Sequence, residues 1–224
     1  MRAANELGPY ARLEGKPVID QRDAAAVAAQ LGREPRGLRA VAHRCPCGKP
    51  DVVETAPRLP DGAPFPTLFY LTCPKAASAI GTLEASGRMR EMTERLVSDP
   101  ALAEAYQAAH DDYLERRDAA ARAQGLEPLP VGTQSSGGMP SRVKCLHALV
   151  AHELAVPGAN PFGAEALSEL IDWWRAGSCV SVEETSLVSC QASQEAVMIA
   201  AAEESTEEAR GVRVPAGRDG EASE

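Results

Sequence analysis

The stretch LRAVAHRCPCGKPDVVETAPRLPDGAPFPTLFYLTCP, residues 38–74, decides the fold of this chain. It begins at residues 38–43 with alternating apolar and polar side chains, a pattern typical of a half-buried strand. Turn-forming residues at 46–50 follow, and residues 52–55 can pair back as the second strand of a hairpin. Residues 65–72 are rich in aromatic and β-favouring residues and give the strongest strand signal. The stretch therefore predicts a small antiparallel sheet of about three strands.

Helical patterns flank this sheet on both sides, which predicts an α+β fold with the sheet packed against several helices. The helices are expected where apolar residues recur at helical spacing between capping and stop signals, over residues 20–31, 76–86, 89–96, 99–124, 141–155 and 165–175. We expect one domain over residues 18–176, preceded by a flexible leader at 1–17. Residues 177–224 are rich in Ser, Glu and Ala and predict a disordered acidic tail.

Composition limits the classes of function. The chain has 224 residues, of which 44% are hydrophobic, yet it contains no run of about 18 apolar residues that would indicate a membrane span. Its beginning lacks the apolar segment of a secretory signal, so a cytoplasmic location is expected. Residues 178–224 carry 10 acidic and 3 basic residues of a chain whose net charge is -9. The body is therefore nearly neutral and lacks the basic surface that general nucleic-acid binding requires.

Three stretches of the sequence resemble a bacterial family known as domain of unknown function 501. They are residues 31–74, 80–92 (IGTLEASGRMREM) and 143–163 (VKCLHALVAHELAVPGANPFG), and the resemblance extends over roughly residues 20–175. It implies a cytosolic bacterial protein from a family without an established activity. Relatives in actinobacteria tend to be encoded near a septum-formation initiator and an exopolyphosphatase. The resemblance thereby implies a link to cell division or to polyphosphate metabolism.

The loop before the late helix is the first candidate site. Gly137 and Gly138 would let backbone N–H groups approach a ligand, and the helix start adds partial positive charge. Arg142 and Lys144 add full charges, and Arg44 would complete the pocket if the hairpin faces this loop. We therefore expect a phosphate-bearing or other anionic small molecule to bind here. The alternative is an ordinary capped helix with solvated basic residues, because no standard phosphate-loop pattern occurs.

Cys145 and His147 lie at the same helix start and are the candidate catalytic residues. A thiol at a helix N-terminus beside a lysine suits nucleophilic chemistry, and a histidine within reach could act as its base. The alternative is a buried structural cysteine. Glu84 is a candidate acid or base, and the alternative is a structural ion pair with an arginine. Whether the protein is an enzyme stays open at this stage.

The cysteines also suggest zinc, the one cofactor that the sequence brings into consideration. A helix from Ser141 would hold Cys145 and His147 about 160° apart, so one ion could hardly bind both. The predicted metal ligands are therefore Cys45, Cys47 and Cys73 from the sheet together with His152 from the helix. The alternative is a set of separate buried cysteines, because C-x-C is not the usual C-x-x-C spacing. A zinc-stabilised domain without enzymatic activity would serve as an adaptor for a protein partner, and Trp173 and Trp174 offer a contact surface.

Overall fold

The sheet of the computed structural model is antiparallel and has the strand order β1-β2-β3. The structure describes residues 19–59, 62–130, 132 and 135–181, so the predicted leader and most of the predicted tail lie outside it. The strands are β1 (Leu38–Arg44), β2 (Pro50–Thr55) and β3 (Phe69–Leu71). β3 is shorter than the predicted strand over residues 65–72. Pro64 and Pro66 have no N–H to offer to a ladder, and only residues 69–71 pair with β2.

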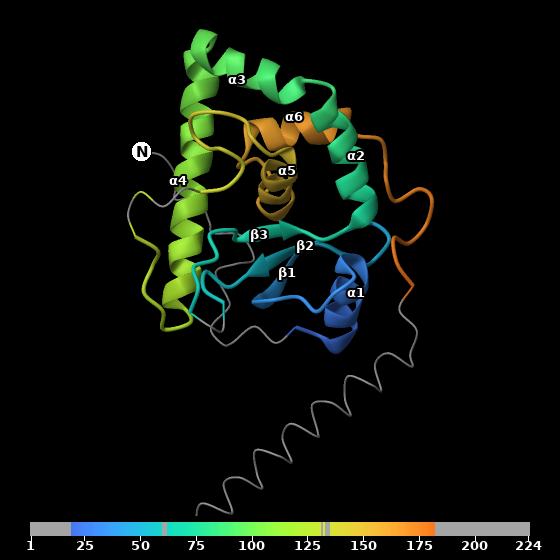
Figure 1. Ribbon diagram of the computed structural model, residues 1–224. Helices are drawn as coiled ribbons and strands as arrows, with labels where there is room; N and C mark the ends of the chain where they lie inside the picture. Colours follow the sequence, from blue (N-terminus) through green and yellow to red (C-terminus); the bar gives the residue numbers. More distant parts are fainter. Residues whose placement is uncertain (1–18, 60–61, 131, 133–134, 182–224) are drawn as a thin grey trace, which may run out of the picture. The chain divides into compact units, whose positions relative to one another are not determined.

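The two faces of the sheet are covered by different helices (Figure 1). Adjacent residues of a strand point to opposite faces, so Val52 and Val53 of the central strand are buried on different sides. Val52 joins the main hydrophobic core with α5 (Leu146–Ala155), whereas Val53 lines a hollow with Val27 of α1 (Gln21–Leu31). The fold is therefore α+β, as predicted.

Four further helices complete the domain. They are α2 (Pro74–Ala85), α3 (Arg88–Ser98), α4 (Pro100–Arg122) and α6 (Pro161–Glu169). Two of them start at a capping side chain: for α4 the Asp99 carboxylate accepts a hydrogen bond from the N–H of Leu102 at 3.0 Å, and for α6 Asn160 Oδ1 accepts one from the N–H of Gly163 at 2.9 Å. α1 begins after Asp20 and ends at Gly32 in the left-handed conformation, as the sequence indicates.

The last two helices differ most from the predicted ranges. α5 begins at Leu146 rather than near Ser141, because the chain before it is bound to the glycine loop: the N–H of Lys144 donates to Gly137 O at 2.7 Å. α6 begins at Pro161 and ends at Glu169, so Trp173 and Trp174 follow the helix instead of lying on it. Because α5 begins only at Leu146, Cys145 precedes the helix and has extended backbone geometry, with φ −153° and ψ 108°.

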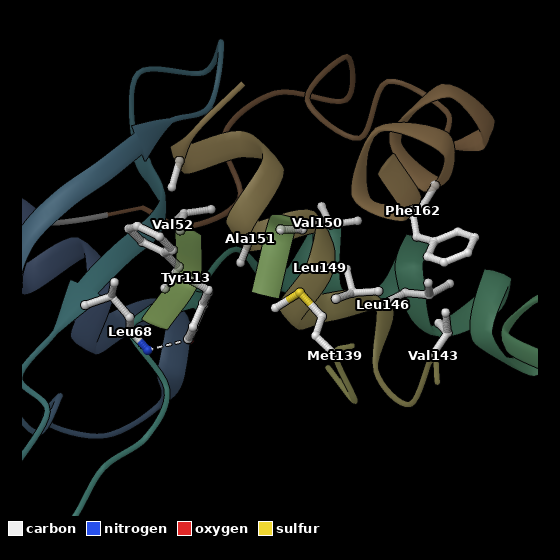
Figure 2. Close-up of a cluster of buried hydrophobic side chains, with 14 of the residues drawn as sticks. Val52, Leu68, Tyr113, Met139, Val143, Leu146, Leu149, Val150, Ala151 and Phe162 are labelled. Carbon is white, nitrogen blue, oxygen red and sulfur yellow. Dashed lines mark hydrogen bonds between the residues drawn. The ribbon is translucent and has the colours of Figure 1, made fainter. Parts of the chain in front are cut away.

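The main core surrounds α5 (Figure 2). Leu146, Leu149 and Val150 of this helix are fully buried, and Phe162 of α6 lies against the same core. Tyr113 of α4 is also buried, and its hydroxyl accepts a hydrogen bond from the N–H of Leu68 at 2.6 Å, drawn as a dashed line in Figure 2. This bond fastens the approach to β3 to the longest helix. Within the described part of the chain, the helices are all too short or too polar to cross a membrane.

The contact between α5 and α6 generates a test of the packing. A Cβ atom at Gly163 would lie 2.3 Å from Leu149 O and 2.8 Å from Glu153 Cβ, so the two helices would have to separate. We expect Gly163→Ala to lower the free energy of unfolding by about 1–3 kcal/mol, measured by urea denaturation. Gly81→Ala is the matched control, because Gly81 lies inside α2 with nothing within 4 Å of its added Cβ. Equal midpoints for Gly163→Ala and the wild type would contradict this account.

Candidate functional site

The β1–β2 turn places two thiols beside each other. The N–H of Gly48 donates to Cys45 O at 2.8 Å, and the N–H of Cys45 donates to Lys49 O at 3.0 Å. Gly48 has φ 85°, a conformation that a residue with a side chain rarely adopts. The Cys45 and Cys47 side chains interact directly, and the N–H of Cys47 points at the Cys45 sulfur. The hairpin therefore presents C-x-C as a pair of adjacent sulfur atoms.

Cys73 brings a third thiol from the start of α2. It is the residue before the first helical position, and its sulfur accepts the backbone N–H groups of Lys75 and Ala76. Its side chain is fully buried, in a small hydrophobic cluster that also contains Cys45 and Trp173. Because Cys73 directly follows the segment that carries β3, the sheet and the helix start together bring it close to the hairpin cysteines.

Cys179 is the fourth thiol, and sequence reasoning missed it by assigning residues from 177 onward to the tail. Lys75 Nζ donates to the carbonyls of Ala176 and Gly177 at 3.1 and 3.0 Å, which fastens this segment to α2. Gln30 Nε2 of α1 donates to Cys179 Sγ at 3.2 Å. The Cys179 thiol interacts with both Cys47 and Cys73. The only signal in the sequence is the cysteine itself, five residues after Trp174.

The four thiols thus form a continuous chain of contacts, from Cys45 to Cys47, then to Cys179 and Cys73. None of the four is in a disulfide. Burial is the main reason that the pKa of Cys45 is raised to about 12 and that of Cys73 to about 11. Burial also opposes ionisation of Cys47, but hydrogen bonds from Lys49 N–H and Cys45 outweigh it, so the pKa of Cys47 lies below its ordinary value. We call Cys45, Cys47, Cys73 and Cys179 the four-thiol cluster.

A buried carboxylate lies close to this cluster. Asp51 is fully buried and exerts an electrostatic effect on Cys45. Its Oδ1 atom is 2.7 Å from His43 Nδ1, whereas its Oδ2 atom is buried without a hydrogen-bond partner. A buried carboxylate oxygen without a partner is costly unless positive charge lies near it.

Glu84, Cys145 and His147 form a second cluster at the start of α5. Their donor atoms, a carboxylate oxygen, Sγ and a ring nitrogen, all lie within 4.8 Å of one another. Glu84 Oε1 accepts the N–H of Leu146 at 2.6 Å and is 3.1 Å from His147 Nδ1. The hydrogen bond with Cys145, followed by the contacts with Glu84, raises the pKa of His147 to about 9 despite the opposing effect of burial. Glu84 is therefore the partner of a histidine and a helix start, not of an arginine.

The proximity of Cys145 and His147 corrects the helical geometry that the sequence analysis assumed. That argument required both residues to lie on one regular helix, where they would point about 160° apart. Because α5 begins at Leu146, Cys145 lies outside the helix in an extended conformation. Its thiol can therefore turn toward the His147 ring, and the pair predicted as catalytic is brought together.

His152 lies in the main core and its contacts are not with cysteines. It is fully buried, with Nε2 3.0 Å from Asp112 Oδ2 and Nδ1 3.4 Å from Asn160 Nδ2. Its ring is stacked on the Phe69 ring, with the two centroids 5.8 Å apart. It lies edge-on to the Tyr113 ring, with a centroid distance of 5.2 Å. These contacts join α5 to α4 and β3, so we leave His152 out of the metal site.

The residues predicted to bind an anion are distributed over two places. Arg44 forms an ion pair with Asp23 of α1, with Nη1 and Oδ1 2.8 Å apart. Arg142 and Lys144 are exposed, close to the second cluster. An added Cβ at Gly137 would lie 2.5 Å from Leu149 Cδ2, and one at Gly138 would lie 2.6 Å from Arg142 O, so both glycines allow close packing of the loop. Anion binding at this loop stays a prediction.

A cavity beside α1 shares no lining residue with either cluster. It has a volume of about 430 Å³, and its lining includes Val27, Leu31, Val53 and Tyr70, with Arg33 and Arg36 among its polar residues. None of the residues predicted from the sequence to catalyse or to bind a ligand or metal is among those that line it.

Comparison with known proteins identifies the family. A model of the family described as "Protein of unknown function (DUF501)" matches residues 41–168. The chain belongs to this family. The match confirms the resemblance seen in the sequence, and this part of the DUF501 chain contains three of the four clustered thiols and all of the second cluster. No curated protein and no solved structure was found to match the chain significantly.

The Asp112–His152 pair predicts how stability depends on pH. Burial opposes ionisation of Asp112, but hydrogen bonds from His152 and Arg116 lower its pKa from 3.8 to about 2. A carboxyl whose pKa is depressed on folding stabilises the protein above its unfolded-state value, and this contribution disappears as the pH falls through the folded-state pKa. We expect the difference in free energy of unfolding between wild type and Asp112→Asn to be constant above about pH 5 and to shrink toward pH 2.

Urea denaturation at a series of pH values measures this difference. Asp111→Asn is the control, because Asp111 lies on the exposed side of α4 and accepts a hydrogen bond from Gln107. A difference between wild type and Asp112→Asn that did not change with pH would show that the Asp112 charge does not stabilise the fold.

Proposed function

We propose that this protein is a zinc-stabilised domain in which Cys45, Cys47, Cys73 and Cys179 bind one structural ion. The observation that supports it is the meeting of four thiols from three separate chain segments in one cluster, in which Cys45 and Cys73 are buried and the other two are partly buried. Cys179 takes the place that the sequence analysis gave to His152. The adaptor role, in which the stabilised domain contacts a protein partner, belongs to the same proposal.

Cysteine thiolates are the preferred ligands of structural zinc, which binds four of them in a tetrahedron with Zn–S distances of about 2.3 Å. Backbone N–H groups already point at the sulfurs of Cys45, Cys47 and Cys73 and would stabilise their thiolate forms. The sulfur contacts form an open chain rather than a closed tetrahedron, so binding of the ion would draw Cys45 and Cys73 together.

The role of the ion would be to hold the segment after α6 against the sheet and α2. This segment carries Trp173, which is buried, and Trp174, which is half-buried. Ile171 just before them is 79% exposed, one of two large hydrophobic side chains described as strongly exposed. Ile171 and the half-buried Trp174 are the apolar side chains that we assign to contact with a protein partner. The ion would therefore fix the shape of the surface that the partner meets.

Anion binding at the start of α5 has less support from the contacts. The N–H of Leu146 is bound by the Glu84 carboxylate, and the N–H groups of Lys144 and Cys145 are bound by Gly137 O. A carboxylate of the protein itself thus occupies the position at the helix start where a phosphate would bind. The exposed charges of Arg142 and Lys144 remain as the support for that hypothesis.

Zinc content tests the proposal. We expect the untagged full-length protein, purified with a thiol reductant and without chelator, to contain one zinc ion per chain more than Cys73→Ser does, measured by elemental analysis. His110→Gln is the control, because His110 belongs to neither cluster and is bound to Ser135, and it should hold as much zinc as the wild type. Equal zinc in wild type and Cys73→Ser would refute the four-thiol site.

The structural role has a readout of its own in the wild type. Removal of the ion by a strong chelator should speed tryptic cleavage after Arg175, an exposed residue in the segment that the ion would hold. A cleavage rate that chelation leaves unchanged would mean that no metal holds this segment.

A further inference from the structure

The second cluster offers a different set of donor atoms from the four-thiol cluster. Glu84 comes from α2, while Cys145 and His147 come from the start of α5. Within the described part of the chain, these three residues form a group in which every pair of donor atoms lies within 4.8 Å, close enough to share a single ion. The three donors belong to the types that bind zinc and similar divalent metals.

The orientation of the His147 ring decides which of its nitrogens can accept a metal. Nε2 lies 3.1 Å from Ala77 O, and a carbonyl only accepts, so Nε2 carries a proton. Metal-binding histidines commonly donate their second ring N–H to a carbonyl in this way, which fixes the tautomer and aims the other nitrogen at the ion. Nδ1 of His147 is therefore the nitrogen that faces the cluster.

Nδ1 of a neutral His147 ring would direct a lone pair at the Glu84 carboxylate. The two atoms are only 3.1 Å apart, and neither would carry a hydrogen. This approach is favourable only if positive charge lies between them, either a proton on Nδ1 or a metal ion bound by both atoms. The Cys145 sulfur lies within 4.8 Å of both atoms and adds a third donor to the same point, which a metal ion would bind together with them.

We propose that Glu84, Cys145 and His147 form a second metal site, with one oxygen, one sulfur and one nitrogen ligand for a divalent ion such as zinc. Three protein ligands leave a fourth coordination position open, as in catalytic rather than structural zinc sites. The Glu84 and His147 side chains are 21% and 32% exposed, so solvent reaches the cluster and water completes the coordination. The inference does not depend on the four-thiol site, with which it shares no residue.

Two hydrogen bonds hold the residues of the site in place before any ion binds. The Leu146 N–H bond to Glu84 Oε1, at 2.6 Å, orients the carboxylate. Gly137 O holds the N–H of Cys145 at 3.3 Å and so fixes the residue that carries the sulfur. The exposed charges of Arg142 and Lys144 lie close by in the chain, which would favour an anionic molecule in the open position.

Cobalt(II) is the probe for this site, because it binds where zinc binds and its absorption reports thiolate ligation. The reduced full-length protein is dialysed against cobalt(II), and bound metal is counted for the wild type and for Cys145→Ser and His147→Gln. Each variant should hold one cobalt ion per chain fewer than the wild type, with affinity at this site lowered by more than about tenfold. His110→Gln is the matched control, since His110 is a half-buried histidine bound to Ser135, and it should resemble the wild type.

A second measurement uses the wild type alone and does not depend on the folding of any variant. Saturating cobalt(II) should slow alkylation of Cys145 by iodoacetamide, followed by mass spectrometry of the peptide, by more than about tenfold. Unchanged alkylation of Cys145, or equal cobalt content in wild type, Cys145→Ser and His147→Gln, would overturn the second site.

The two proposals fail separately. Metal lost only in Cys73→Ser would support the four-thiol site and refute the second one. Metal lost only in Cys145→Ser and His147→Gln would do the reverse.

Discussion

The burial of α5 is the constraint on which the rest of the structure depends. Seven of its residues are buried, and they include His152 and Glu153, whose polar groups cannot be left without partners. Each of these groups is satisfied by another element: Asp112 of α4 binds His152, and the chain before α6 binds Glu153 through the N–H groups of Gly158 and Asn160. These bonds fix how α5 lies against its neighbours. The second cluster is a further case of the same requirement, because Glu84 satisfies the first N–H of the helix and His147 together.

Local signals made most of the fold predictable. The hairpin, the α1 boundaries and the start of α4 depend on alternation, capping side chains and a stop glycine, all of which act within a few residues. The errors lie where a distant contact decides the outcome. The glycine loop bonds to Lys144 and delays the start of α5. No local pattern carries that information.

The same distinction applies to the candidate sites. Cys45, Cys47 and Cys73 were identified because the sheet that carries them was predictable. Cys179 was assigned to the tail, because a distant contact sets its position. Lys75 donates hydrogen bonds to the carbonyls of Ala176 and Gly177, about a hundred residues later in the chain. Cys145 and His147 are predicted as a catalytic pair but excluded as ligands of a single ion, because the predicted helix start lies a few positions too early. Glu84 was noticed without its partner, since only the folded chain brings α2 to the start of α5.

The family match ends at residue 168, whereas the four-thiol cluster extends to Cys179. A fragment trimmed to the matched residues would keep all three strands except the first residues of β1, yet it would lack α1, both tryptophans and the last of the four sulfur atoms. Its hairpin and the start of α2 would carry Cys45, Cys47 and Cys73 without Cys179. The segment that the family model matches is therefore shorter than the set of residues that contact one another around the four thiols.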